Sequence, residues 1–174
     1  MQNRNKYSNY GMYAAGMLIL TTFDTLSGYF FGSLGRLALL ESIMHIMLIA
    51  LLFMKTRNFV LAAPYAFLAV TSAFHGYGYL TFAFDFVLYF FTFLMCLLLL
   101  TDILPDKAHN IVSKLWFVPA SLWFLYYLVT LIISVASNPA GVDVTLLVFS
   151  AFLYLLYAGA HLLVGLWLKK PYKN

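Results

Sequence analysis

Six long apolar runs, separated by short polar or glycine-containing breaks, make up most of the chain. Each run has close to the roughly 20 residues that an α-helix needs to cross the hydrocarbon core of a bilayer. This pattern predicts an all-α fold, a polytopic transmembrane helical bundle that forms one domain over residues 1–174. The predicted spans are Tyr10–Phe31, Arg36–Met54, Phe59–Tyr79, Leu80–Thr101, Ile111–Ser137 and Val144–Leu168.

The breaks between the runs differ in strength. The longest polar loop is expected from Asp102 to Asn110. The weakest break follows the third run, because the chain stays apolar through residues 79–84, and a five-span alternative is open there. Pro64 and Pro119 each lie a few residues into a run. Since proline removes a backbone donor, we expect both to kink their helices.

Lysine and arginine are distributed unevenly over the breaks. With the N-terminus in the cytoplasm, only Arg36 lies on the outer side. The basic residues on the inner side are then Arg4, Lys6, Lys55, Arg57, Lys107, Lys114, Lys169, Lys170 and Lys173. Cytoplasmic loops of membrane proteins carry such an excess. The distribution predicts cytoplasmic N- and C-termini, an even number of spans and a multi-pass protein of the cell membrane.

The composition agrees with this architecture and excludes some partners. Hydrophobic residues make up 64% of the chain and charged residues 9%, and the mean hydropathy is +0.90. The net charge of +4 comes from basic residues at the ends of apolar runs, which suits anionic lipid headgroups better than nucleic acid. The lipid bilayer is the expected partner, and nucleic acid is excluded. Tyr10, Tyr13, Trp116 and Trp167 lie near span ends, where we expect interfacial anchors.

A few ionisable residues interrupt the apolar runs, mostly in the outer half of the predicted membrane. At the helical rise of about 1.5 Å per residue, Asp24 lies about 10 Å and Glu41 and Asp85 about 7 Å below the outer end of their spans. His45 lies near the middle of its span. Such residues normally face the interior of a bundle or a water-filled cavity. We therefore predict an outward-opening ligand-binding pocket with tyrosine walls from Tyr29, Tyr77, Tyr79 and Tyr89. Its polar residues are Asp24, Glu41, His45 and Asp85, with Arg36 and His75 at the mouth.

Three carboxylates against one arginine favour a ligand that is cationic or donates hydrogen bonds, or a bound proton. Glu41 and His45 are four residues apart and share a helix face. The alternative is that the same residues only pair across helices, as in a non-catalytic membrane subunit or a sensor. An intramembrane enzyme using Glu41, His45 and Asp85 is another alternative.

His45 and His161 lie at similar depth on two predicted spans that run in the same direction. Two such histidines can hold one haem or share a metal ion, so a redox subunit is a further alternative. The sequence contains no motif that identifies a cofactor or a substrate. Cys96 is the single cysteine and forms no internal disulfide.

The leading interpretation is a protein that binds a small solute or ion and translocates it, as an oligomer or as a subunit of a larger transporter. The size, the six spans and the cytoplasmic ends are similar to those of the substrate-binding subunits of vitamin-uptake ECF transporters, whose pocket opens outward. The likeness is architectural. The first span lacks an A-x-x-x-A contact motif, since Ala14 and Ala15 are followed by Met17 and Leu18.

Overall fold

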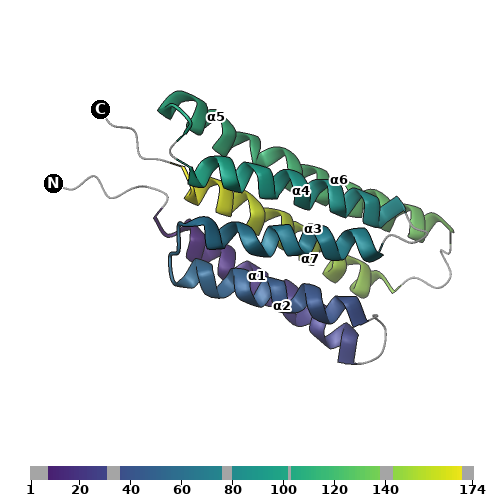
Figure 1. Cartoon of the computed structure of the whole chain (residues 1–174). Coiled ribbons are helices and arrows are strands. Elements are labelled where there is room, and N and C mark those ends of the chain that lie inside the picture. The colour runs from purple at the N-terminus through teal and green to yellow at the C-terminus, as the bar shows by residue number, and fades with distance from the viewer. Residues whose placement is uncertain (1–7, 31–35, 76–79, 102, 138–142, 170–174) are drawn as a thin grey trace.

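The computed structural model describes residues 8–30, 36–75, 80–101, 103–137 and 143–169, and it leaves the side chains of Arg36, Leu37, His75 and residues 80–83 undescribed. Over these ranges all regular structure is helical, and no strand occurs. Figure 1 shows long helices that lie side by side, with one short helix at one end of the bundle. The predicted all-α class is confirmed.

The helices follow the apolar runs closely. The long ones are α1 (Tyr10–Phe30), α2 (Arg36–Phe53), α3 (Ala62–His75), α4 (Leu80–Leu100), α6 (Phe117–Ser137) and α7 (Val144–Trp167). A 3₁₀ turn, η1 (Phe59–Leu61), leads into α3, and the short α5 (Asp106–Leu115) precedes α6. Because α3 and α4 are separate helices packed against each other, the chain has six long helices rather than five.

The six long helices form a closed ring. Each contacts the next in the order α1, α2, α3, α4, α6 and α7, and α7 returns to α1. The seam between α4 and α6 is the least extensive of these contacts, and α5 contacts both helices there. In Figure 1, α1 begins and α7 ends at the same end of the bundle, where α5 also lies.

Helix α5 overturns part of the loop expected from Asp102 to Asn110. Asp106 lies in its first turn and Lys114 in its last turn, so both charges interact favourably with the helix dipole. His109 and Asn110 are buried on the side facing the bundle, and His109 Nε2 donates to the Leu99 carbonyl at 3.0 Å. The expectation was wrong for residues 106–110 because His109, Asn110 and Ser113 lie on one buried face of a helix, and His109 bonds to the end of α4.

The two prolines lie in first turns. Pro64 follows the start of α3 and Pro119 follows the start of α6, where the missing N–H has no partner to lose. Just before each proline the chain passes from one helical segment to another, from η1 to α3 and from α5 to α6. The kinks at these two prolines stay a prediction.

Two tryptophans expected at the membrane interface are buried instead. Trp116 is 0% exposed and packs edge-on against Tyr65, with ring centroids 5.9 Å apart. Trp167 is 1% exposed, and the Arg57 guanidinium lies 4.6 Å from the centre of its ring. Both rings are packed inside the bundle, so the prediction that Trp116 and Trp167 are interfacial anchors was wrong.

Among the residues that the structure describes, two helical stretches are long and apolar enough to cross a membrane, Asp106–Ser137 and Val144–Trp167. Only 17% of the apolar window is buried in the first and 28% in the second. Ala38–Phe53, Phe59–Phe74 and Phe84–Leu100 are shorter apolar helical stretches. The apolar surfaces of the two long stretches are thus mostly uncovered by the rest of the chain.

Gly165 and Gly16 provide a matched test of this packing. A methyl group on Gly165 would overlap Trp116 Cβ and Cγ, whereas one on Gly16 meets nothing within 4 Å. We expect Gly165→Ala to destabilise the protein by about 1–3 kcal/mol. Gly16→Ala is expected to be neutral or to stabilise by up to about 1 kcal/mol, through helix propensity. Thermal unfolding in detergent measures both, and equal stability of the two variants would contradict the packing of α7 on Trp116.

Candidate functional site

A cavity of about 160 Å³ lies between the helices, and every long helix contributes to its wall. Asp24 lies near the end of α1, Glu41 near the start of α2 and Asp85 near the start of α4. The cavity is therefore in the half of the bundle away from the end where α1 begins (Figure 1). Its lining consists of Thr21, Asp24, Thr25, Glu41, His45, Ser72, Asp85, Tyr89, Tyr127, Leu153, Tyr154 and Tyr157.

Asp85 is held in place by two aromatic donors from α6. Trp123 Nε1 donates to Asp85 Oδ1 at 3.1 Å. The Tyr127 hydroxyl lies 3.1 Å from Oδ1 and 3.0 Å from Oδ2 and donates to this carboxylate. Hydrogen bonds to an ionised acceptor are stronger than neutral ones, so these contacts fix the carboxylate on the cavity wall and join α4 to α6.

His45 is fixed through both ring nitrogens. Its Nδ1 lies 2.9 Å from the Glu41 carbonyl oxygen, which only accepts, so Nδ1 carries a proton. In the neutral ring Nε2 is then an acceptor, and the Tyr157 hydroxyl donates to it at 3.2 Å. The Tyr89 hydroxyl lies 3.5 Å from the same nitrogen. The ring thereby connects α2 with α7 and α4.

The charges of the cavity are acidic. Glu41 is half-buried on its wall, and Asp24 is exposed at its edge. The structure brings the predicted Asp24, Glu41, His45 and Asp85 together as lining residues. The side chains of Arg36 and His75, predicted at the mouth, lie outside the described part of the chain.

The tyrosines of the wall differ from those expected. Tyr89 lines the cavity as predicted, whereas Tyr29 stacks edge-on with Phe30 and is not part of the lining. Tyr77 and Tyr79 lie outside the described residues. Sequence reasoning missed Trp123 and Tyr127, which are four residues apart on α6, and Tyr154 and Tyr157, which are three apart on α7. Their helical spacing was the available signal.

His161 lies beneath the cavity in a cluster of aromatic rings. It is 0% exposed, and its ring centroid is 4.5 Å from that of Tyr157 and 4.7 Å from that of Trp123. Its Nδ1 donates to the Tyr157 carbonyl at 2.9 Å, while Nε2 is buried and has no hydrogen-bond partner among the described residues. Tyr157 contacts both His45 and His161, so its ring occupies space that a haem between them would need.

The carboxylates of the cavity are not arranged as a metal site. Within the described ranges, no three His, Cys, Asp or Glu side chains are close enough together to hold a metal ion. The site is instead a wall of separated carboxylates, hydroxyls and aromatic rings around a small space. Such an arrangement can bind a ligand by charge and hydrogen bonds at several points.

The chain matches no family model, no curated protein and no solved structure.

The contact between Asp85 and Tyr127 predicts a measurable coupling. Tyr127→Phe and Asp85→Asn should each lower stability by about 1–3 kcal/mol, because each removes one partner of a charge-assisted hydrogen bond. In the double variant the losses should not add, and the coupling free energy should exceed about 0.5 kcal/mol in a thermal unfolding cycle. Tyr13→Phe serves as the control, because Tyr13 is 58% exposed on the outside of α1. Additive losses would show that the bond contributes no stability.

Proposed function

We propose that this chain is a six-span membrane protein with cytoplasmic ends that binds a small solute or ion in its cavity and moves it across the cell membrane. The observation that carries the proposal is the cavity itself, which Asp24, Glu41 and Asp85 line from three different helices of a bundle whose helices are mostly apolar. Ionisable groups within spans are expensive, and they commonly mark the path of a substrate or ion.

The lengths of the helices support six spans. Helices α1, α4 and α6 have 21 residues, α2 has 18 and α7 has 24. At a rise of about 1.5 Å per residue they are roughly 27 to 36 Å long, which matches a hydrocarbon core of about 30 Å. The turn η1 and α3, with 3 and 14 residues, together reach a similar length.

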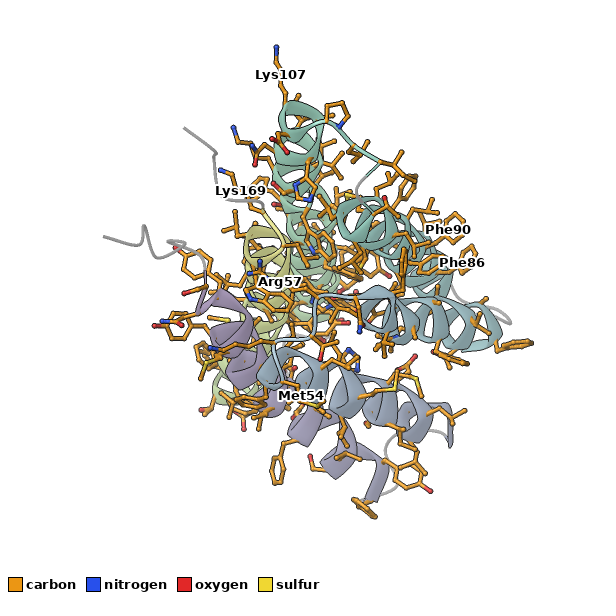
Figure 2. All side chains as sticks on the ribbon, turned by 60° about the vertical axis from the view of Figure 1, so that its left-hand side comes forward. Met54, Arg57, Phe86, Phe90, Lys107 and Lys169 are labelled. Atoms are coloured by element: carbon orange, nitrogen blue, oxygen red, sulfur yellow. The ribbon has the colours of Figure 1, made fainter. Side chains whose placement is uncertain are left out.

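The outward-facing side chains also support a lipid environment. Large apolar residues are exposed on every long helix, including Phe23 at 72% and Phe74 at 66%. Figure 2 shows Phe86 and Phe90 of α4 pointing away from the bundle, with ring centroids 5.9 Å apart. Water-soluble monomers rarely expose apolar surface on this scale. The same surface would serve for contacts in an oligomer or in a larger transporter.

The distribution of charge supports the orientation. Lys107 and Lys169 project from the end of the bundle where α7 ends (Figure 2). Lys55 and Arg57, in the connection from α2 to η1, lie at that end too. Basic residues mark the cytoplasmic side of a membrane protein. The cavity lies in the opposite half, so in this orientation it opens outward.

The orientation can be tested with single cysteines at the two ends. Cys96 is buried, which gives a low background. A membrane-impermeant maleimide added to intact cells should label Ser137→Cys at the end of α6, and should label Lys107→Cys of α5 only after the membrane is permeabilised. The inverse result would reverse the orientation. Labelling of both sites from outside would contradict a membrane crossing by α6, which is the one long helix between the two positions.

Ligand binding can be tested by native mass spectrometry of the whole protein purified in mild detergent. We expect an added mass that is absent from Glu41→Gln, because that change removes a carboxylate of the cavity while keeping its shape. Asp143→Asn is the matched control, since Asp143 caps α7 outside the cavity lining and asparagine also caps helices well. A bare protein whose only change in Glu41→Gln is lower stability would favour a structural subunit.

A further inference from the structure

Several hydroxyl groups of the cavity wall already donate their protons to acceptors within the protein. The Thr21 hydroxyl donates to the Leu18 carbonyl at 3.1 Å, and the Thr25 hydroxyl donates to the Thr21 carbonyl at 3.1 Å. Both are bonds to the carbonyl three or four residues earlier on the same helix. Each hydroxyl oxygen keeps its lone pairs, so it can present an acceptor but no free proton to the cavity.

Two of the aromatic hydroxyls behave in the same way. Tyr127 donates to Asp85, at 3.0 Å to the nearer oxygen, and Tyr157 donates to His45 Nε2 at 3.2 Å. The remaining proton of the neutral His45 ring is donated to the Glu41 carbonyl. These internal bonds engage the protons of five groups of the wall and leave the oxygens of the four hydroxyls as acceptors, beside three carboxylates.

The lining therefore complements a ligand that is positively charged and rich in N–H donors. Tyr127 and Tyr154, stacked with centroids 4.4 Å apart, and the ring of Tyr89 add negative aromatic surface beside the same space. The described lysines and arginines belong to other parts of the chain and do not line the cavity. Since the carboxylates do not converge on one point, a cation with its charge on a nitrogen suits the site better than a metal ion.

The volume sets the size of this ligand. The cavity of about 160 Å³ is close to the roughly 150 Å³ that accommodates one benzene molecule in an engineered protein cavity. A ligand of about six non-hydrogen atoms fits such a space.

We infer that the solute is a small protonated primary or secondary amine, whose ammonium N–H groups are bound by Glu41, Asp24 and the outward lone pairs of Thr21 and Thr25. This inference rests on the proposed function, because it names the class of solute for the same cavity. Asp85, already held by Trp123 and Tyr127, supplies negative charge at the back of the site. The ligand would supply N–H donors beside hydroxyls of Thr21, Thr25, Tyr127 and Tyr157 that already donate to acceptors of the protein.

The test uses three probes with equal numbers of non-hydrogen atoms: n-butylammonium, tetramethylammonium and 1-butanol. The first has charge and N–H donors, the second has charge without donors, and the third is neutral. Isothermal titration calorimetry on the whole protein in mild detergent should show saturable binding of n-butylammonium. Binding of the other two should be weaker by at least about tenfold, as expected when charge-assisted hydrogen bonds are absent.

Two variants assign the binding to the cavity. Glu41→Gln should weaken n-butylammonium binding by at least about tenfold. Asp143→Asn should leave it unchanged, because Asp143 is outside the cavity lining. Thermal unfolding of each variant shows whether it is folded, and Asp24→Asn replaces Glu41→Gln if the latter is not.

Each contrary result overturns a defined part of the inference. Equal binding of tetramethylammonium would overturn the role of N–H donors, and equal binding of 1-butanol would overturn the positive charge. If n-butylammonium does not bind saturably, the amine class is wrong. A retained mass that depends on Glu41 in native mass spectrometry would then still support solute binding, whereas its absence as well would overturn both proposals.

Discussion

A carboxylate inside an apolar bundle needs partners, because an unpaired charge in a medium of low dielectric constant is far less stable than in water. Asp85 has them in Trp123 and Tyr127 of α6. These bonds cross the seam where α4 and α6 have the least contact, while α5 covers the same seam nearer the chain ends. The ring of six helices is therefore closed in the cavity half by hydrogen bonds to one carboxylate together with two ring contacts between α4 and α6, Phe84 with Tyr126 and Tyr89 with Trp123.

That constraint also shapes the cavity. Once Trp123 and Tyr127 are directed toward Asp85, the aromatic cluster beneath them fills the bundle with Tyr157 and His161, and the open space remains only above it. His45 is connected to the same cluster through Tyr157. The polar network thus separates the half of the bundle that contains the cavity from the half packed by rings such as Trp116 and Trp167.

The two halves also differ in charge. The acidic side chains of the cavity lie in one half, and Lys55, Arg57, Lys107 and Lys169 lie at the other end. In the proposed membrane orientation the basic end would face anionic headgroups, and α5, with its buried polar face and exposed Ile111 and Leu115, would lie at that interface. The proposed orientation and the proposed charge of the solute both depend on this separation of charges.

The sequence by itself determined the helices and the polar residues that needed an explanation. Helix number and bounds depend on local hydropathy and length, so six apolar runs became six long helices with shifts of a few residues at most ends. Asp24, Glu41, His45 and Asp85 stood out because each interrupts an apolar run, and all four line the cavity. The first half of α5, residues 106–110, was assigned to a loop because its polar residues were taken for a solvated segment.

The tertiary structure alone decided which groups meet. These helices are apolar on nearly all sides, so their sequences do not define which face turns inward. That Trp123 and Tyr127 bind Asp85, 38 and 42 residues away, depends on how the helices rotate and cross when they pack. The same rotation buried Trp116 and Trp167. It also placed hydroxyl donors of the cavity wall next to acceptors of the protein itself. Rotation about a helix axis is set by contacts with other helices, and no local pattern in the chain encodes it.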